Sequence, residues 1–574
     1  MKKLLGYMRA YMKETVLAPF FKLLEASFEL AVPLVVARII DVGIKSGIDG
    51  LIITDSIILL VLGIVGLSSA LIAQYFAAKA AIGFATDVRS RVFGHLQKIS
   101  YTSLDRLGKS RMVTTLTNDI NQLQTGVNMV LRLLLRSPLI VFGSMIMAFT
   151  IDAGTATIFA VMIPLLFISV FAVMKITLPK YKGIQTELDS IVLSTRESFG
   201  GVRDIRAFGA EKKEEEAFRK KNSAYRKMQN SAGVVSSVLN PLTFVIVNFA
   251  IIALVWVGAV KVDGGSLSQG QVIALYGYLS QILIELMKLA NLIVTVTRSI
   301  AAGNRVEEVL EIPEENTDGK TLATDGNIAV KFENVSLCYD GASENSLENV
   351  SFEVPRGYTV GVIGGTGSGK TSLVNLIPKF YTATAGKIEI GGRDISELSA
   401  KTLRDIVGYV PQKSVLFRGT LRENLLWGNE NATDEEIMKA VKIAQAENVI
   451  ASKSDGLDSY VAQGGGNFSG GQKQRLCIAR ALVKNPDILI LDDSCSALDY
   501  LTDKKLRRAL SSADKKMTVF IVSQRTASFS DADMIIVLDD GKVSAIGTHE
   551  ELLEKSDVYR EIYESQYGER EAGA

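Results

Sequence analysis

Cysteine and histidine are both scarce in this sequence. Its 574 residues include three cysteines, Cys338, Cys477 and Cys495, and none has the spacing of a metal-ligand motif or a disulfide framework. All three lie in the second half, as expected of a domain in a reducing compartment. The two histidines are His95 and His549, so few positions can support histidine chemistry. The formal net charge of +1 gives no reason to expect a nucleic-acid partner.

Long apolar runs fill the first half of the chain. Because a helix needs about 20 residues to cross about 30 Å of hydrocarbon, these runs predict about six membrane spans. The clear runs lie at 57–73, 139–149, 157–174 and 244–260. Two weaker candidates, at 16–44 and 270–296, carry charged residues. The chain is also too long for one hydrophobic core, so at least two domains are expected.

The loops between the runs alternate in length and charge. Those after the first, third and fifth spans are short, whereas those after the second and fourth are long and rich in Lys and Arg. An excess of Lys and Arg marks the cytoplasmic side, so both termini of this multi-pass membrane protein are expected there. The long loops have few Pro or Gly residues and are expected to extend the spans as helices. Residues 1–14 are too short and polar for a signal sequence and are expected to form an amphipathic helix at the lipid interface.

The composition changes near residue 312. We divide the chain into a transmembrane domain at 1–311, a polar linker at 312–327 and a soluble domain at 328–574. In the soluble part, short β-rich runs alternate with helical patterns, which predicts an α/β domain with a largely parallel sheet and an antiparallel subdomain.

A phosphate-binding motif lies in the soluble domain. The stretch GGTGSGKT, residues 364–371, follows an apolar strand and precedes a helical run. Glycines allow backbone N–H groups to surround phosphate oxygens, Lys370 can reach the β and γ oxygens, and the Thr371 hydroxyl can ligate magnesium. Alone, the motif could also be a glycine-rich turn with a surface lysine. The predicted nucleotide contacts of this loop are Gly364, Gly365, Thr366, Gly367, Ser368, Gly369, Lys370, Thr371 and Ser372.

Two further motifs follow in a fixed order. FSGGQKQRLCIARAL begins at Phe468, and PDILILDD ends at Asp493. Together with the phosphate loop and the six spans, they make the chain resemble an ATP-binding-cassette (ABC) exporter half-transporter of the multidrug and lipid-exporter type. The resemblance covers essentially residues 1–570. It implies a six-helix membrane exporter domain followed by a P-loop ATPase domain with antiparallel β and helical subdomains, and it implies ATP and Mg²⁺ as cofactors.

The resemblance also implies roles for single residues. Tyr339 falls where the family stacks an aromatic ring on adenine, although it could be an ordinary edge-strand tyrosine. Thr371, Gln412 and Asp492 match the magnesium side of the site. Asp499 matches the aspartate of a loop that crosses to the partner subunit. The signature loop, which caps the γ-phosphate on the opposite subunit, matches Ser469, Gly470, Gly471 and Gln472. The stretches 115–120 and 205–211 resemble cytoplasmic turns that dock on nucleotide-binding domains.

Three positions depart from the family pattern. Asp493 stands where the family has a catalytic glutamate, Gln524 where it has a switch histidine, and Gln463 where many exporters have glutamate. Asp is one methylene shorter than Glu, and displacing a catalytic group by about 1 Å can cost roughly a hundredfold in rate. Glutamine cannot carry the positive charge of imidazolium. This site is therefore expected to bind ATP and to hydrolyse it poorly, unless the two changes are simply tolerated.

The signature loop, in contrast, is intact. In the family's head-to-tail dimer it would complete the site of the other subunit, so the expected partner is a second half-transporter with an intact catalytic Glu and switch His. The alternatives are a homodimeric exporter with slow ATPase and an ATP-gated regulatory or channel-like protein.

Charged residues inside the spans leave two interpretations open. Glu285 and Lys288, one helical turn apart in the sixth span, either support the bundle or line the substrate path. Glu25 and Arg38 in the first span favour a supporting role. The sequence does not identify the exported substrate beyond the classes that the resemblance implies, an amphipathic drug, a lipid or a peptide.

Overall fold

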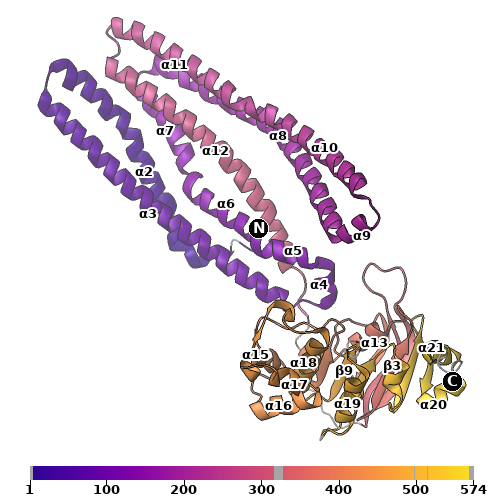
Figure 1. Cartoon of the computed structure of the whole chain (residues 1–574). Helices are drawn as coiled ribbons and strands as arrows, with labels where there is room; N and C mark the ends of the chain where they lie inside the picture. The colour runs from indigo at the N-terminus through magenta and orange to yellow at the C-terminus, as the bar shows by residue number, and fades with distance from the viewer. Residues whose placement is uncertain are drawn as a thin grey trace. The chain divides into compact units, whose positions relative to one another are not determined.

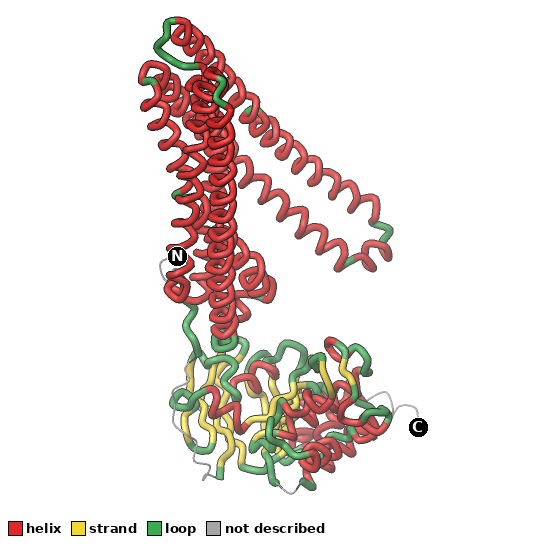
Figure 2. The backbone as a smooth tube through the Cα atoms, turned by 90° about the vertical axis from the view of Figure 1, so that its left-hand side faces the viewer, coloured by secondary structure: helices red, strands yellow, loops and turns green. Residues whose placement is uncertain are grey.

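The chain forms two compact units, one of them helical and one mixed. The structure, a computed structural model, describes residues 4, 6–315, 327–494, 496, 498–513 and 515–567. The first unit comprises 1–94 and 110–311, and the second comprises 95–109 and 312–574. This division differs from the one expected from the sequence, because residues 95–109 pack with the soluble domain. Most of the expected linker, residues 316–326, lies outside the described residues. Figure 2 shows that helices make up the first unit, whereas the second combines helices and strands.

The first unit is a bundle of long helices (Figure 1). Its elements are η1 (Gly6–Tyr11), α2 (Met12–Arg38), η2 (Ile39–Ile44), α3 (Asp49–Leu96), α5 (Lys109–Thr114), η3 (Thr115–Asp119), α6 (Ile120–Leu133), α7 (Arg136–Ile151), α8 (Ala153–Gly200), α9 (Val202–Ala207), α10 (Glu211–Ser237), α11 (Leu239–Asp263) and α12 (Gln269–Leu310). Helices α3 and α8 have 48 residues each, and at that length a helix extends about 72 Å, far beyond the hydrocarbon layer. The long basic loops are therefore helical, as predicted.

Five of the six expected spans are long and apolar enough to cross a membrane. Within the described residues they are the helical stretches Asp49–Leu96, Lys109–Ile151, Ala153–Gly200, Glu211–Asp263 and Gln269–Leu310. Helix α2, the first expected span, is not among them, because its centre carries Lys22, Glu25 and Glu29. The expected N-terminal amphipathic helix is instead a 3₁₀ helix over Gly6–Tyr11 that leads directly into α2, and residues 1–3 and 5 lie outside the described residues.

Helix α12 is the central element of this unit. It packs against α2, α6, α7, α8 and α11, and Figure 1 shows it between the α2–α3 pair and the group α8, α10 and α11. A capping box begins it, in which the Ser268 hydroxyl and the Gln271 side chain bond each other's backbone N–H groups. Tyr278, fully buried, donates its hydroxyl to the Leu30 carbonyl at 2.7 Å and so ties α12 to α2.

The second unit contains three sheets. Its strands are β1 (Ile328–Leu337), β2 (Leu347–Pro355), β3 (Thr359–Gly364), β4 (Ala385–Ile390), β5 (Arg393–Asp394), β6 (Val407–Val410), β7 (Gly419–Thr420), β8 (Tyr460–Val461), β9 (Ile488–Asp492), β10 (Thr518–Val522), β11 (Met534–Asp539) and β12 (Lys542–Gly547). The described strands give a six-stranded sheet in the order β12-β11-β3-β10-β9-β6, a four-stranded sheet in the order β2-β1-β4-β5 and the pair β7-β8. The large sheet is parallel except for β12, and the four-stranded sheet is antiparallel, as expected.

Helices cover the large sheet. They are α13 (Lys370–Leu376), α14 (Ala400–Ile406), α15 (Leu421–Leu426), α16 (Asp434–Ile443), α17 (Glu447–Ala451), α18 (Gly470–Val483), α19 (Tyr500–Ser511), α20 (His549–Lys555) and α21 (Asp557–Tyr567), with 3₁₀ turns η4 (Gly456–Asp458), η5 (Gln463–Gly465) and η6 (Thr526–Phe529). Alternate residues of β9 face two different cores: Leu489 and Leu491 pack among the helices, whereas Ile488 and Ile490 pack toward the antiparallel sheet. A strand buried on both faces has an unbroken apolar sequence, which explains the run ILIL at 488–491.

Helix α4 (Tyr101–Leu107) belongs to this unit although it lies between two spans in sequence. The Tyr101 ring lies 4.5 Å from that of Phe380, and the Tyr381 hydroxyl donates to the Asp105 carboxylate at 2.6 Å. The docking turns expected at 115–120 and 205–211 stay predictions. The first of these stretches contains the π-helix η3 of the first unit, where the buried Asp119 carboxylate binds Arg305 of α12 at 2.5 Å.

Candidate nucleotide-binding site

The phosphate loop connects β3 to α13, as predicted. Glycine is required at both of its ends. Gly364 has φ of +159°, and a Cβ there would lie 2.1 Å from the Leu538 carbonyl oxygen. Gly369 has φ of +92°, in the left-handed region, and a Cβ there would lie 2.6 Å from the Ser346 carbonyl oxygen. The loop therefore packs directly on neighbouring backbone and leaves its other face free for a ligand.

Lys370 closes the loop from within. Its ammonium donates to the carbonyl oxygens of Gly364 at 2.9 Å and Gly365 at 2.6 Å, with the Ser368 hydroxyl at 3.4 Å. Burial lowers the pKa of Lys370, and the nearby carboxylates of Asp493 and Asp492 act in the opposite direction. A phosphate oxygen is a stronger acceptor for an ammonium than a neutral carbonyl, so this lysine has a better partner to gain when nucleotide binds.

Two oxygen ligands meet at the end of β9. The Thr371 hydroxyl lies 3.0 Å from Oδ1 of Asp492, while Oδ2 of the same carboxylate accepts a hydrogen bond from the Tyr409 hydroxyl at 3.1 Å. Asp492 is only 2% exposed, and burial raises its pKa, opposed by the hydrogen bonds from Thr371 and Tyr409. A hydroxyl beside a buried carboxylate is a donor set that suits Mg²⁺, so the residues present fit the ion that the resemblance implies.

The two positions that depart from the family pattern, Asp493 and Gln524, lie beside this pair. Asp493 follows β9 with φ of +45°, and Oδ2 of its carboxylate accepts a hydrogen bond from Nε2 of Gln412 at 3.3 Å. Gln524 follows β10, and its carbonyl oxygen accepts a hydrogen bond from the Gln566 side chain at 2.7 Å. This hydrogen bond involves only the backbone of Gln524 and does not constrain its side chain.

These residues enclose one pocket of about 260 Å³. Its lining is Ser346, Thr366, Gly367, Gly369, Lys370, Thr371, Ser372, Gln412, Asp492, Asp493, Val522, Ser523 and Gln524. The structure thus brings together eight of the predicted ATP and magnesium contacts with Asp493 and Gln524, whereas Gly364, Gly365 and Ser368 of the phosphate loop are not among the lining residues. Tyr339 does not line the pocket, but its hydroxyl donates to Ser372 at 2.9 Å and its ring meets Tyr381 edge-on at 5.0 Å. Tyr339 therefore lies beside α13, the helix that begins at Lys370.

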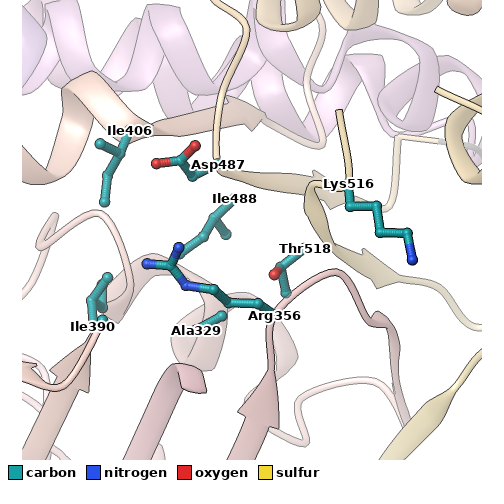
Figure 3. A pocket seen from close by; sticks show the side chains of 9 residues that line it. Ala329, Arg356, Ile390, Ile406, Asp487, Ile488, Lys516 and Thr518 are labelled. Carbon is teal, nitrogen blue, oxygen red and sulfur yellow. The ribbon is translucent and has the colours of Figure 1, made fainter. Parts of the chain in front are cut away.

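A second, small pocket lies at the opposite ends of the same strands (Figure 3). Its lining includes Ile488 at the start of β9, Thr518 at the start of β10, and the cations Arg356 and Lys516. Its volume of about 50 Å³ is too small for a nucleotide. Ligands of open α/β sheets bind at the carboxyl ends of the strands, which again favours the pocket around Lys370.

The signature residues form a different surface. Ser469 is the N-cap of α18: its hydroxyl accepts from the Gln472 N–H at 3.3 Å, and its own N–H donates to the Gln472 side chain at 2.9 Å. Gly470 and Gly471 form the first turn of this helix, and none of these four residues lines the pocket. Asp499 is the N-cap of α19: its carboxylate accepts hydrogen bonds from the N–H and the hydroxyl of Thr502, and these hydrogen bonds lower the pKa of its carboxyl group.

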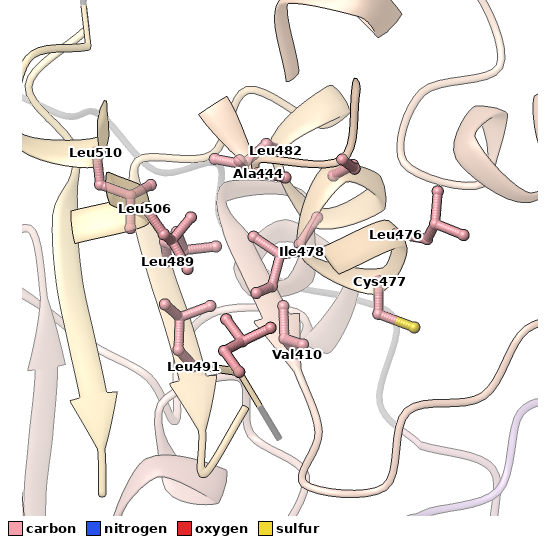
Figure 4. Packing of buried hydrophobic residues seen from close by; sticks show 14 of the residues in the cluster. Val410, Ala444, Leu476, Cys477, Ile478, Leu482, Leu489, Leu491, Leu506 and Leu510 are labelled. Carbon is pink, nitrogen blue, oxygen red and sulfur yellow. The ribbon is translucent and has the colours of Figure 1, made fainter. Parts of the chain in front are cut away.

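Apolar packing fixes the position of this helix end. Figure 4 shows Ile478 and Leu482 of α18 against Leu489 and Leu491 of β9, with Leu506 of α19 beside them. Because α18 and β9 share this core, the signature turn and the Asp492 carboxylate are held by one rigid block. Burying each such Leu or Ile side chain contributes about 1.5–3 kcal/mol.

Sequence reasoning missed three supporting side chains. Tyr409 holds Asp492, the buried Ser494 hydroxyl donates to the Val410 carbonyl at 3.0 Å, and Gln566 near the C-terminus bonds both Thr526 and Gln524. None carries a motif. A polar tyrosine in the otherwise apolar strand β6 was the one available signal.

Comparison with known proteins identifies the family of the chain. Residues 15–287 match the family described as the ABC transporter transmembrane region, and residues 347–496 match the family described as ABC transporter. An uncharacterized ABC transporter ATP-binding protein of Bacillus subtilis, YfiB, is 34% identical over 569 residues, which cover 99% of each chain. The putative multidrug export ATP-binding/permease protein YgaD of the same organism is 32% identical over 586 residues, again 99% of each. The chain belongs to the ABC transporter family.

Within that family it has the layout of a half-transporter, with one transmembrane region and one ATP-binding domain. A solved structure of a bacterial Atm1-family ABC exporter with ATP bound shares its fold, with a TM-score of 0.82 over 97% of this chain and 98% of that one, at 24% identity. The predicted fold class is confirmed: a helical membrane exporter domain precedes a nucleotide-binding domain.

Replacing Lys370 by alanine is expected to abolish nucleotide binding at this chain's own loop, because it removes the charge that faces the β and γ phosphates. Photolabelling of the purified chain with an azido-ATP analogue measures this. A matched control is Lys379→Ala, which also removes a half-buried ammonium bound to two carbonyls, Ile395 at 2.8 Å and Leu398 at 3.0 Å, outside the pocket. Equal labelling of both variants would contradict the assignment of Lys370.

Proposed function

We propose that this chain is one subunit of a heterodimeric ATP-driven exporter in a bacterial cell membrane. It binds ATP and Mg²⁺ at its own hydrolysis-impaired site and supplies its signature loop to a competent site on the partner. The observation that carries this proposal is the composition of the pocket: the phosphate loop, Thr371 and Asp492 are in place, while Asp493 and Gln524 occupy the catalytic positions.

Binding and hydrolysis require different groups in this pocket. The loop N–H groups, Lys370 and the Thr371–Asp492 pair bind and orient the phosphates, and a bound magnesium ion would neutralise phosphate charge between Thr371, Gln412 and Asp492. Hydrolysis also needs a base that orients water. The Asp493 carboxylate is one methylene short of that position and already accepts a hydrogen bond from Gln412. Gln524 offers only a neutral amide.

The two histidines of the chain cannot replace the missing one. Nδ1 of His549 lies 2.7 Å from the Tyr559 hydroxyl, and Nδ1 of His95 lies 3.0 Å from the Glu314 carboxylate. Neither lines the nucleotide pocket. A homodimer would therefore contain two impaired sites, which supports a partner half-transporter with an intact catalytic Glu and switch His.

The proposal also covers the class of exported substrate and the orientation in the membrane. The fold and the relative named for putative multidrug export support export of an amphipathic drug, lipid or peptide. The Lys- and Arg-rich helical extensions support cytoplasmic termini and a cytoplasmic nucleotide-binding domain. The competing functions are a homodimeric exporter with slow ATPase and an ATP-gated regulatory or channel-like protein. ATPase and transport assays of this chain alone, and together with a half-transporter that carries the catalytic Glu and switch His, distinguish these cases.

Replacing Asp493 by asparagine tests the asymmetry directly. Because this site is already slow, the variant complex is expected to keep more than half of its steady-state ATPase activity. The matched Glu→Gln change at the partner's corresponding position is expected to remove nearly all of it. Comparable losses from the two changes would show two equal sites and would overturn the proposal.

A further inference from the structure

A chain of four alternating charges links three helices inside the membrane unit. Arg136, the first residue of α7, contacts the Glu285 carboxylate of α12 and lies 2.6 Å from the Glu29 carboxylate of α2. Lys288, one turn further along α12, lies 2.7 Å from the same Glu285. Glu29, Arg136, Glu285 and Lys288 therefore follow one another with alternating signs that sum to zero. A side branch is neutral as well: Glu25 lies 3.7 Å from Arg136 and pairs with Lys22 at 2.5 Å.

The middle of this chain is buried and its ends are open. The Arg136 and Glu285 side chains are 7% and 2% exposed, whereas those of Glu29 and Lys288 are 39% and 42% exposed. Glu285 also accepts the Ser137 hydroxyl at 2.8 Å, so its charge is satisfied without Lys288. Bundle support accounts for the buried pair. It does not require two further opposite charges at the exposed ends, which are costly within a membrane span.

The depth of the four charges can be counted from one fixed end of the helices. There Asp41 accepts the Gly270 N–H at 2.8 Å, which joins the end of the first hairpin helix to the start of α12. Glu29 lies about 18 Å from this point along the first helix, and Glu285 about 22 Å along α12. In a hydrocarbon layer of about 30 Å, these charged side chains lie in the half that is farther from Asp41. That half is the cytoplasmic leaflet in the orientation proposed above.

We propose that Glu29 and Lys288 form a recognition site for an amphiphile with a zwitterionic headgroup, whose cationic group binds Glu29 and whose phosphate or carboxylate binds Lys288. This rests on the proposed export function and narrows its substrate class. A zwitterion leaves the site neutral, whereas a ligand with a net charge adds an uncompensated charge at low dielectric. Ile284, one turn from Lys288 on the same helical face and 55% exposed, offers apolar surface beside the charge.

Binding of fluorescent amphiphiles to the purified full-length chain tests this, without ATP, so that the outcome is independent of the ATPase proposal. The probes are short-chain phosphatidylethanolamine, phosphatidylglycerol, an alkyl trimethylammonium and a zwitterionic dipeptide. The unaltered chain is expected to bind a zwitterionic probe most tightly. Preference for the lipid supports the proposal, whereas preference for the dipeptide would show that the site takes a soluble zwitterion and not an amphiphile.

Two variants should shift the preference in opposite directions. Lys288→Gln is expected to weaken the zwitterionic probe about tenfold while the cationic probe still binds, because one charge-assisted contact is lost. Glu29→Gln is expected to weaken binding of the zwitterionic probe by a similar factor while the anionic probe still binds. The control is Lys261→Gln, which breaks another helix-linking ion pair, that of Lys261 with Asp152. Equal effects of both variants on every probe, or no effect, would show that the charges only support the bundle.

Discussion

Replacing Gly471 by aspartate in this chain is expected to lower the steady-state ATPase rate of the assembled transporter by about 10²–10³-fold. The signature turn of α18 is placed by its core away from the chain's own pocket. In the proposed dimer it faces the nucleotide of the competent site, where backbone N–H groups stabilise charge that develops on the γ-phosphate. A carboxylate at this turn would repel that phosphate and displace the donors.

The same substitution should leave the fold intact. Gly471 has a helical conformation within the first turn of α18, and the Ser469–Gln472 capping box remains. A negative charge near a helix N-terminus is favourable by about 0.3–1 kcal/mol. The melting temperature should therefore not fall, and Gly471→Asn, of equal size without the charge, separates repulsion from bulk. If Gly471→Asp leaves most of the activity, the signature loop does not serve the competent site.

The order of effects within one chain is the informative result. Gly471→Asp should nearly silence the complex, whereas Asp493→Asn should barely slow it, although both residues belong to the same domain and their elements share one core. This order follows if the two positions serve different nucleotides. A larger loss from Asp493→Asn than from Gly471→Asp would mean that each chain runs its own chemistry.

Much of the fold could be predicted because its signals are local. The apolar run of β9 predicted a buried parallel strand, and the glycines of the phosphate loop predicted a tight turn between strand and helix. Both elements form where expected. The long basic loops were predicted as helices, and α3 and α8 are continuous over 48 residues each.

What escaped prediction depends on contacts between distant residues. Asp492 and Tyr409 are far apart in sequence, and their contact exists only because β6 and β9 are neighbours in the sheet. The packing of α4 against Phe380 and Tyr381 likewise exists only in the folded domain. Periodicity and motifs cannot report such pairings.

The charged residues of the spans show the same limit. The spacing of Glu285 and Lys288 predicted a possible pair, and their contact is present. It could not add Arg136 and Glu29, because these lie on α7 and α2 and meet α12 only in the bundle. The alternation of sign along four side chains, which carries the substrate proposal, is a property of three helices together.

Restoring the two catalytic positions in this chain should restore hydrolysis at its own site. In a complex whose partner carries the Glu→Gln change, the double variant Asp493→Glu, Gln524→His is expected to raise the residual ATPase rate by about 10²-fold, because the carboxylate regains the reach that costs roughly that factor when lost. Histidine should fit, since the Gln524 backbone is anchored by Gln566 independently of its side chain. Glutamate adopts the left-handed conformation of residue 493 less readily than aspartate does, so a small fall in melting temperature is expected. The control is the same double change with Lys370→Ala, which should stay inactive. If the double variant binds azido-ATP normally and its ATPase rate stays at the residual level, Asp493 and Gln524 are not what limits this site.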